Sequence, residues 1–141
     1  MPKGTVINST EVMPFQCDED YSSKMILDNS NTGSERLQIN EGTLRGGGST
    51  AGAAHPAPYD EVYYVVKGSA MLTMDGAEYK IEKGYTIFIP GGTFHALRNL
   101  SDTEDFVILT IWPLQPKEGV NEAYDMRLKS WGKSYRTIHE K

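Results

Sequence analysis

Short apolar segments separated by glycine recur along the chain between residues 35 and 112. The segment 35–44, ERLQINEGTL, alternates apolar and polar residues with a period of two, which is typical of a strand with one buried face. The segments 61–67 and 106–112, EVYYVVK and FVILTIW, are rich in the β-branched and aromatic residues that strands favour. By the same reasoning we expect further strands at 69–74, 77–81, 85–90 and 94–99.

Turns that contain glycine divide these segments. The pair Asp75-Gly76 predicts a two-residue hairpin, because a type I′ turn needs positive φ at both central positions. Three consecutive glycines at 46–48 end the first strand, and Gly68 and Gly84 end later ones. Short strands divided in this way predict an antiparallel sandwich or barrel, and closure into a barrel would remove the exposed edges of the apolar strands.

The two ends of the chain are less regular. We expect an N-terminal arm at residues 1–34, irregular apart from one strand near 25–27, a barrel at 35–112 and a C-terminal extension at 113–141. The stretch 121–131, NEAYDMRLKSW, indicates a short helix within that extension.

Composition narrows the class of protein. A chain of 141 residues fits one domain, and 38% hydrophobic with 23% charged residues is ordinary for a globular protein. The net charge of −5, with no basic block, argues against nucleic acid as a partner, and no apolar run is long enough for a membrane span. The chain begins without a stretch resembling a signal peptide, and Cys17 is its only cysteine, so we expect a cytoplasmic protein.

The candidate chemistry lies in His55, Glu61 and His95. Glu61 opens a strand whose alternation puts it on the same face as Tyr63 and Val65, and a carboxylate inside a barrel is costly unless a cation or hydrogen bonds compensate it. Two imidazoles and a carboxylate suit a divalent ion such as Fe, Mn, Ni or Zn and leave positions open for substrate. The alternative is that the histidines are hydrogen-bonded interior residues and that Glu61 pairs with an arginine.

Two segments of the chain resemble the two signature motifs of the cupin superfamily. In the first, His55, Glu61 and Gly68 match. The second motif is matched at every position in 84–99, GYTIFIPGGTFHALRN, by Gly84, Pro90, Gly92, His95 and Asn99. The resemblance covers residues 35–112 and implies an all-β fold, a double-stranded β-helix or jelly-roll barrel with short extensions, which usually binds a divalent metal in its mouth.

One position departs from the first motif. Ala57 stands where the superfamily has its second histidine, so one of the four usual metal ligands is missing. Three consequences are open. His55, Glu61 and His95 alone hold the metal, or a neighbour such as Asp60, Tyr59 or Tyr63 substitutes, or the site binds metal weakly and the histidines act as acid-base or binding groups.

Polar residues near the expected centre are candidates for substrate contact. Tyr63 could donate a proton or act as a general base, or it could be a core aromatic residue with a satisfied hydroxyl. Arg36, Gln38 and Asn40 share one face of the first strand. If that face is the interior, they would bind carboxylate or hydroxyl groups, with Arg36 favoured for an anion; if it is the exterior, they are ordinary surface residues.

These features predict a metal-dependent cupin enzyme that acts on a small polar metabolite, either a sugar derivative or a hydroxy or keto acid. The expected reaction is a proton transfer by an isomerase, lyase or cyclase, with Glu61 and Tyr63 as catalytic residues. An iron-dependent dioxygenase and a non-catalytic metabolite-binding module are the alternatives. Cupins of this size are commonly dimers, so we expect a homodimer in which Trp112 and Trp131 could pack at the interface.

Overall fold

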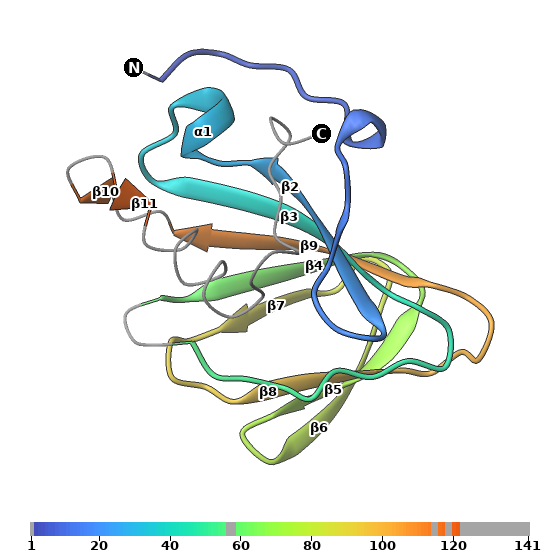
Figure 1. The fold of residues 1–141 in the computed structure, drawn as a ribbon. Helices are drawn as coiled ribbons and strands as arrows, with labels where there is room; N and C mark the ends of the chain where they lie inside the picture. Colours follow the sequence, from blue (N-terminus) through green and yellow to red (C-terminus); the bar gives the residue numbers. More distant parts are fainter. Residues whose placement is uncertain (1, 56–58, 114–115, 118–119, 122–141) are drawn as a thin grey trace.

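Two antiparallel sheets face one another and enclose a single core (Figure 1). The computed structural model describes residues 2–55, 59–113, 116–117 and 120–121. The larger sheet has the order β1-β2-β3-β9-β4-β7, and the smaller has the order β6-β5-β8. This arrangement is the jelly-roll barrel that the sequence predicts.

The strands follow the expected segments closely. Those of the larger sheet are β1 (Phe15–Gln16), β2 (Tyr21–Leu27), β3 (Leu37–Leu44), β4 (Glu61–Lys67), β7 (Thr86–Ile89) and β9 (Phe106–Pro113). The smaller sheet contains β5 (Ser69–Met74), β6 (Ala77–Glu82) and β8 (His95–Asn99). The remaining elements are the 3-10 turn Ser9–Glu11, the short helix α1 (Asn29–Thr32), and the pair β10 (Pro116–Lys117) and β11 (Val120–Asn121).

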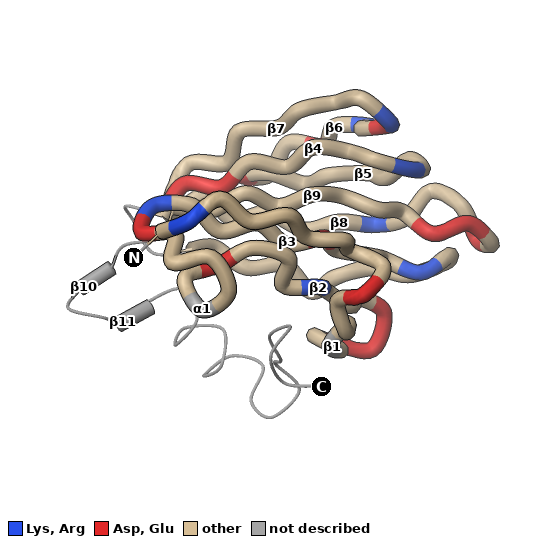
Figure 2. The backbone as a smooth tube through the Cα atoms, turned by 90° about the horizontal axis from the view of Figure 1, so that it is seen from above, with Lys and Arg blue, Asp and Glu red and all other residues tan. Residues whose placement is uncertain are grey.

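Every second residue of the central strands points into the core. In β9, every second residue from Phe106 to Trp112 is buried, and in β4 the buried residues are Glu61, Tyr63 and Val65. The hairpin between β5 and β6 turns at Asp75 and Gly76, both with positive φ (47° and 82°), which confirms the predicted turn. Charged residues lie mainly at strand ends and in loops (Figure 2). No helix in the described part of the chain is long and apolar enough to cross a bilayer.

The N-terminal segment is more regular than the sequence indicates. Instead of one short strand near 25–27, residues of β2 pair with β3 from Tyr21 opposite Leu44 to Leu27 opposite Ile39. Ser23 and Met25 both lie on the interior face of β2. Because one of these buried residues is polar, the sequence of β2 does not show the alternation of apolar and polar residues that marks a strand. The helix expected at 121–131 falls outside the described residues except for Asn121, which belongs to β11.

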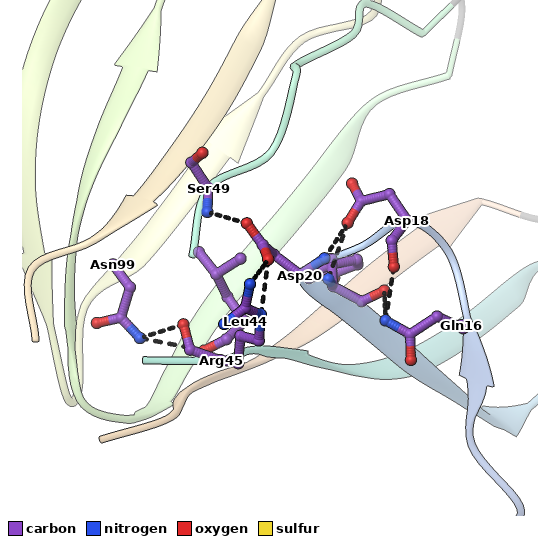
Figure 3. Close-up of polar contacts among 8 residues, drawn as sticks. Gln16, Asp18, Asp20, Leu44, Arg45, Ser49 and Asn99 are labelled. Carbon is purple, nitrogen blue, oxygen red and sulfur yellow. Dashed lines mark hydrogen bonds and ion pairs between the residues drawn. The ribbon is translucent and has the colours of Figure 1, made fainter. Parts of the chain in front are cut away.

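A group of hydrogen bonds holds the chain in place where it leaves β3 (Figure 3). Asp20 accepts a hydrogen bond from Arg45 Nε at 2.6 Å and another from the backbone N–H of Ser49 at 3.1 Å. The amide of Asn99 donates to the carbonyls of Leu44 and Arg45, both at 3.1 Å. These bonds hold the start of the segment that runs on to His55.

Candidate metal centre

Three side chains from separate parts of the chain converge inside the barrel. The Nε2 atoms of His55 and His95 lie 3.0 Å and 3.3 Å from the same oxygen, Oε1 of Glu61. One possible ligand atom from each residue lies within 4.8 Å of those of the other two. Among the described residues this is the one group of three histidine, cysteine or acidic side chains that comes so close.

Backbone hydrogen bonds place the two imidazoles side by side. The segment before His55 runs antiparallel to β8, and Ala53 and His95 exchange N–H···O bonds of 3.0 Å. The carbonyl of His55 then accepts a bond of 2.6 Å from the N–H of Gly92, in the turn before β8. Gly92 has a φ of 84°, a conformation that glycine adopts without strain. The glycine-proline segment therefore orients both histidines.

The Glu61 carboxylate is charged although it is buried. Burial opposes its ionisation, but hydrogen bonds from His55 and His95 and the charges of these residues outweigh that effect and lower the pKa of Glu61. Burial acts to lower the pKa of His95, yet the contacts with Glu61 and with the Thr93 carbonyl raise it overall. Without a metal, the cluster is thus a buried, charge-assisted hydrogen-bond network.

The orientation of His95 is set by its second nitrogen. Nδ1 lies 2.9 Å from the Thr93 carbonyl and donates to it, so Nε2 is the nitrogen turned toward Glu61. This is the arrangement found at metal-binding histidines, whose outer nitrogen is usually hydrogen-bonded.

The geometry fits a divalent ion. Ligand atoms bonded at about 2.1 Å to one ion lie about 3 Å apart, and the two histidine-glutamate separations have this value. Nitrogen and carboxylate donors together suit iron, manganese, nickel or zinc. His55, Glu61 and His95 would hold such an ion and leave further positions for ligands.

A cavity of about 210 Å³ opens beside the three residues. Its walls come from the segment 50–53 and from both sheets, and they include Tyr63, Leu97, Thr110 and Trp112. Pockets for drug-sized ligands occupy about 300–1,000 Å³, so this cavity suits a small molecule.

The structure brings some expected substrate residues to the cavity and not others. Asn40 lines it, and Tyr63 lies edge-on to His95 with ring centroids 5.9 Å apart. Gln38 is fully buried and is not among the described residues of the wall, and both polar atoms of its amide lack a hydrogen-bond partner within the described part of the chain. Arg36 is exposed, precedes β3 and lines a separate hollow with Lys3. Arg36 thus does not continue the interior row of Gln38 and Asn40.

The structure describes all three residues proposed to replace the missing ligand, Tyr59, Asp60 and Tyr63. Ala57 lies outside the described residues. Asp60 Oδ1 accepts the N–H of Gly91 at 3.0 Å, and Asp60 is not a member of the metal-binding group.

Trp112 lies inside the barrel, not at a surface where a second copy could pack. Its side chain is 5% exposed, and its ring is T-shaped against His55 with centroids 4.1 Å apart. Its Nε1 donates to Thr110 Oγ1 at 3.2 Å. The alternation of 106–112 puts Thr110 and Trp112 on one face, and this signal could have identified both as interior residues. Trp131 lies outside the described residues.

A jelly-roll barrel with two histidines and a glutamate in one interior cavity is a cupin-type architecture. Residues 40–112 match the family described as the cupin domain, and the chain belongs to this family. The family assignment confirms the resemblance carried by the two motifs.

Sequence relatives are distant. Protein MJ1618 of Methanocaldococcus jannaschii is 30% identical over 54 residues, which are 38% of this chain and 43% of that protein. The tetracenomycin polyketide synthase protein TcmJ of Streptomyces glaucescens is 26% identical over 96 residues, 68% of this chain and 64% of TcmJ. The chain thus spans less than two thirds of the length of these curated relatives.

Solved structures share the fold at low identity. KdgF from Halomonas sp. aligns with a TM-score of 0.69 and 16% identity, over 82% of this chain and 97% of KdgF. The polyketide cyclase RemF from Streptomyces resistomycificus aligns with a TM-score of 0.69 and 20% identity, over 92% of this chain and 99% of RemF.

Proposed function

We propose that this chain is a metal-dependent enzyme that transfers a proton on a small metabolite carrying hydroxyl and carbonyl groups. The observation that supports this most strongly is the convergence of both histidine Nε2 atoms on Glu61 Oε1 beside a cavity. Sugar derivatives and hydroxy or keto acids are the substrate classes that the sequence suggests.

In this proposal, His55, Glu61 and His95 bind the metal, and Tyr63 takes part in the proton transfer. His55, Glu61 and His95 would hold a divalent ion, which would supply Lewis-acid polarisation of a carbonyl or hydroxyl group. Tyr63, on the same face of β4 as Glu61, is the candidate to hold or move the proton at its phenolic oxygen. The Thr93 carbonyl and the Trp112 ring keep the two imidazoles in place.

Isomerisation, elimination and cyclisation are the three reaction types that this chemistry covers. One relative is named as a polyketide synthase protein and one structural neighbour as a polyketide cyclase, which supports cyclisation among the three. Of Arg36, Gln38 and Asn40, we retain Asn40 as a substrate contact because it lines the cavity.

Proton transfer is tested without knowledge of the natural substrate. The protein, loaded separately with Zn, Mn, Ni or Fe, is incubated in heavy water with a panel of aldoses, ketoses and hydroxyketones, and deuterium incorporation beside the carbonyl is followed by NMR. We expect metal-dependent exchange that Glu61→Gln abolishes and that Tyr63→Phe reduces about 100-fold or more. Exchange by Glu61→Gln equal to that of the wild type would contradict the proposal.

The alternatives have distinct signatures. Oxygen consumption by the iron-loaded protein would identify the dioxygenase, whereas binding without exchange or oxygen uptake would identify a metabolite-binding module. Homodimer formation and a cytoplasmic location remain predictions from the sequence, and light scattering at micromolar concentration tests the first.

A further inference from the structure

The tyrosine that opens β2 is held by the turn before it. The carbonyl of Tyr21 accepts hydrogen bonds from the backbone N–H groups of Cys17 and Asp18, at 2.9 Å and 3.2 Å. Its own N–H donates to Asp18 Oδ1 at 2.8 Å, and the same oxygen accepts the N–H of Asp20 at 2.9 Å. These bonds fix the backbone of Tyr21 within the turn between β1 and β2.

The ring of Tyr21 lies on Gly42, on the interior face of β3. Gly42 shares the buried face of this strand with Asn40 and Leu44. A Cβ atom at residue 42 would lie 2.6 Å from Cζ and 3.0 Å from Cε1 of Tyr21, and it would overlap the phenolic oxygen. Glycine therefore leaves the space that the phenol occupies. Tyr21 also packs against the hydrophobic core and lines the cavity.

The strand register places Tyr21 and the candidate metal centre at opposite ends of the cavity. Gly42, Ile108 and Val65 lie side by side on β3, β9 and β4. Glu61 precedes Val65 by four residues on β4, which is about 13 Å at the usual rise per residue. Gly42 is displaced further by two strand spacings, or about 10 Å. Because Glu61 and Tyr21 line the same cavity, the cavity extends from one to the other.

We infer that the Tyr21 ring forms the end wall of the cavity and sets the length of the ligand. A molecule bound at the metal centre then extends toward β2 by about the length of one six-membered ring. A longer molecule has to displace an aromatic ring that Gly42 and the core support, and such overpacking is costly. The inference rests on the proposed function and narrows its substrates to short ones, such as single sugar units and short hydroxy or keto acids.

Two hydroxamates of different length test the position of this wall. Benzohydroxamate and 4-phenylbenzohydroxamate chelate a metal through the same two oxygens, and the second is longer by one phenyl ring. Each is titrated by calorimetry into zinc-loaded protein, and the zinc content is measured before and after. We expect wild-type protein to bind benzohydroxamate about tenfold tighter or more, because the longer compound overlaps the Tyr21 ring.

Three variants change the wall in different directions. Tyr21→Leu shortens the side chain, keeps an apolar contact with the core, and should reduce the preference for benzohydroxamate to about twofold or less. Tyr21→Phe is the matched control, which keeps the ring and should keep the preference. Gly42→Ala puts a methyl group where the phenol lies, so the ring has to move into the cavity and the preference should rise several-fold.

The outcomes distinguish this inference from the proposed function. If the protein holds zinc and binds benzohydroxamate, equal binding of the two compounds by the wild type overturns the inference alone. The same preference in Tyr21→Leu as in the wild type, or its loss in Tyr21→Phe, also overturns the inference alone. If zinc-loaded protein binds neither compound, the inference and the proposed substrate chemistry both fail. If the protein holds no zinc, the proposed function fails, and the inference fails with it.

Discussion

The imidazole of His55 stands edge-on to the indole of Trp112, with ring centroids 4.1 Å apart and planes at 66°. The two residues come from different elements, a loop before β4 and the end of β9. Nε2 of the same imidazole lies 3.0 Å from Oε1 of Glu61. Trp112 therefore restricts the one residue of the candidate metal centre that no regular strand carries.

This contact predicts that Trp112 contributes to metal affinity without touching the metal. Trp112→Leu should weaken binding about tenfold or more, because outer-shell residues of metal sites have effects of this size. Trp112→Phe keeps an aromatic edge and should lose less. Calorimetric titration with zinc measures both. Equal affinity in Trp112→Leu and the wild type would show that the indole does not position His55.

Asn99 stabilises the fold, and its role is structural. Its Nδ2 donates to the carbonyls of Leu44, Arg45 and Glu104, at 3.1, 3.1 and 2.8 Å, so one side chain joins β8 to two other stretches of backbone. Asn99→Ala should lower the free energy of unfolding by about 2–3 kcal/mol, because it removes the donor of three hydrogen bonds that are buried or partly buried. Urea denaturation measures this loss. Asn99→Asp is the matched variant: it keeps the acceptor for Ser101 N–H, so restored stability would refute the role of the amide donor.

The metal-free protein should be most stable in mildly acidic solution. The lowered pKa of Glu61 contributes stability above its unfolded value of 4.5, which is lost as the pH falls through the folded pKa. The raised pKa of His95 contributes stability below its unfolded value of 6.5, which is lost as the pH rises through the folded pKa. Thermal melts of chelator-treated protein should therefore give the highest Tm between these two values.

Bound metal should remove the loss of stability above pH 6.5, because metal binds the deprotonated form of an imidazole and its affinity therefore rises with pH. The zinc-loaded protein should keep its Tm above pH 6.5 while the metal-free protein loses stability there. A metal-free profile that is flat from pH 4 to 8, or one that rises throughout, would contradict the pairing of Glu61 with His95.

The strands and the site were predictable from the sequence to different degrees. The alternation of β3 and the β-branched and aromatic composition of β4 and β9 identify these strands, and the Asp75-Gly76 pair identifies its own turn, so these elements follow from local sequence. The alternation of β2 is weak because Ser23 is buried, and its bonds to β3 are non-local. Such a strand cannot be read from a single segment.

The site residues divide in the same way. His55, Glu61 and His95 belong to two motifs of defined spacing, and the structure brings them together. Arg36 was grouped with Gln38 and Asn40 by alternation, but β3 begins after it, at Leu37, so the alternation does not extend to it. The contact of Trp112 with His55 was not predictable, because the order of residues does not show that the loop carrying His55 packs against the end of β9.

The metal content of purified protein tests the central claim most directly. Protein prepared without chelator and dialysed against zinc should contain about one equivalent of metal per chain by elemental analysis. His95→Ala and Glu61→Gln should each retain little or none, whereas His139→Ala, the matched change at the third histidine, should retain the wild-type amount. Equal metal content in the wild type and His95→Ala, or none in the wild type, would contradict a centre formed by His55, Glu61 and His95.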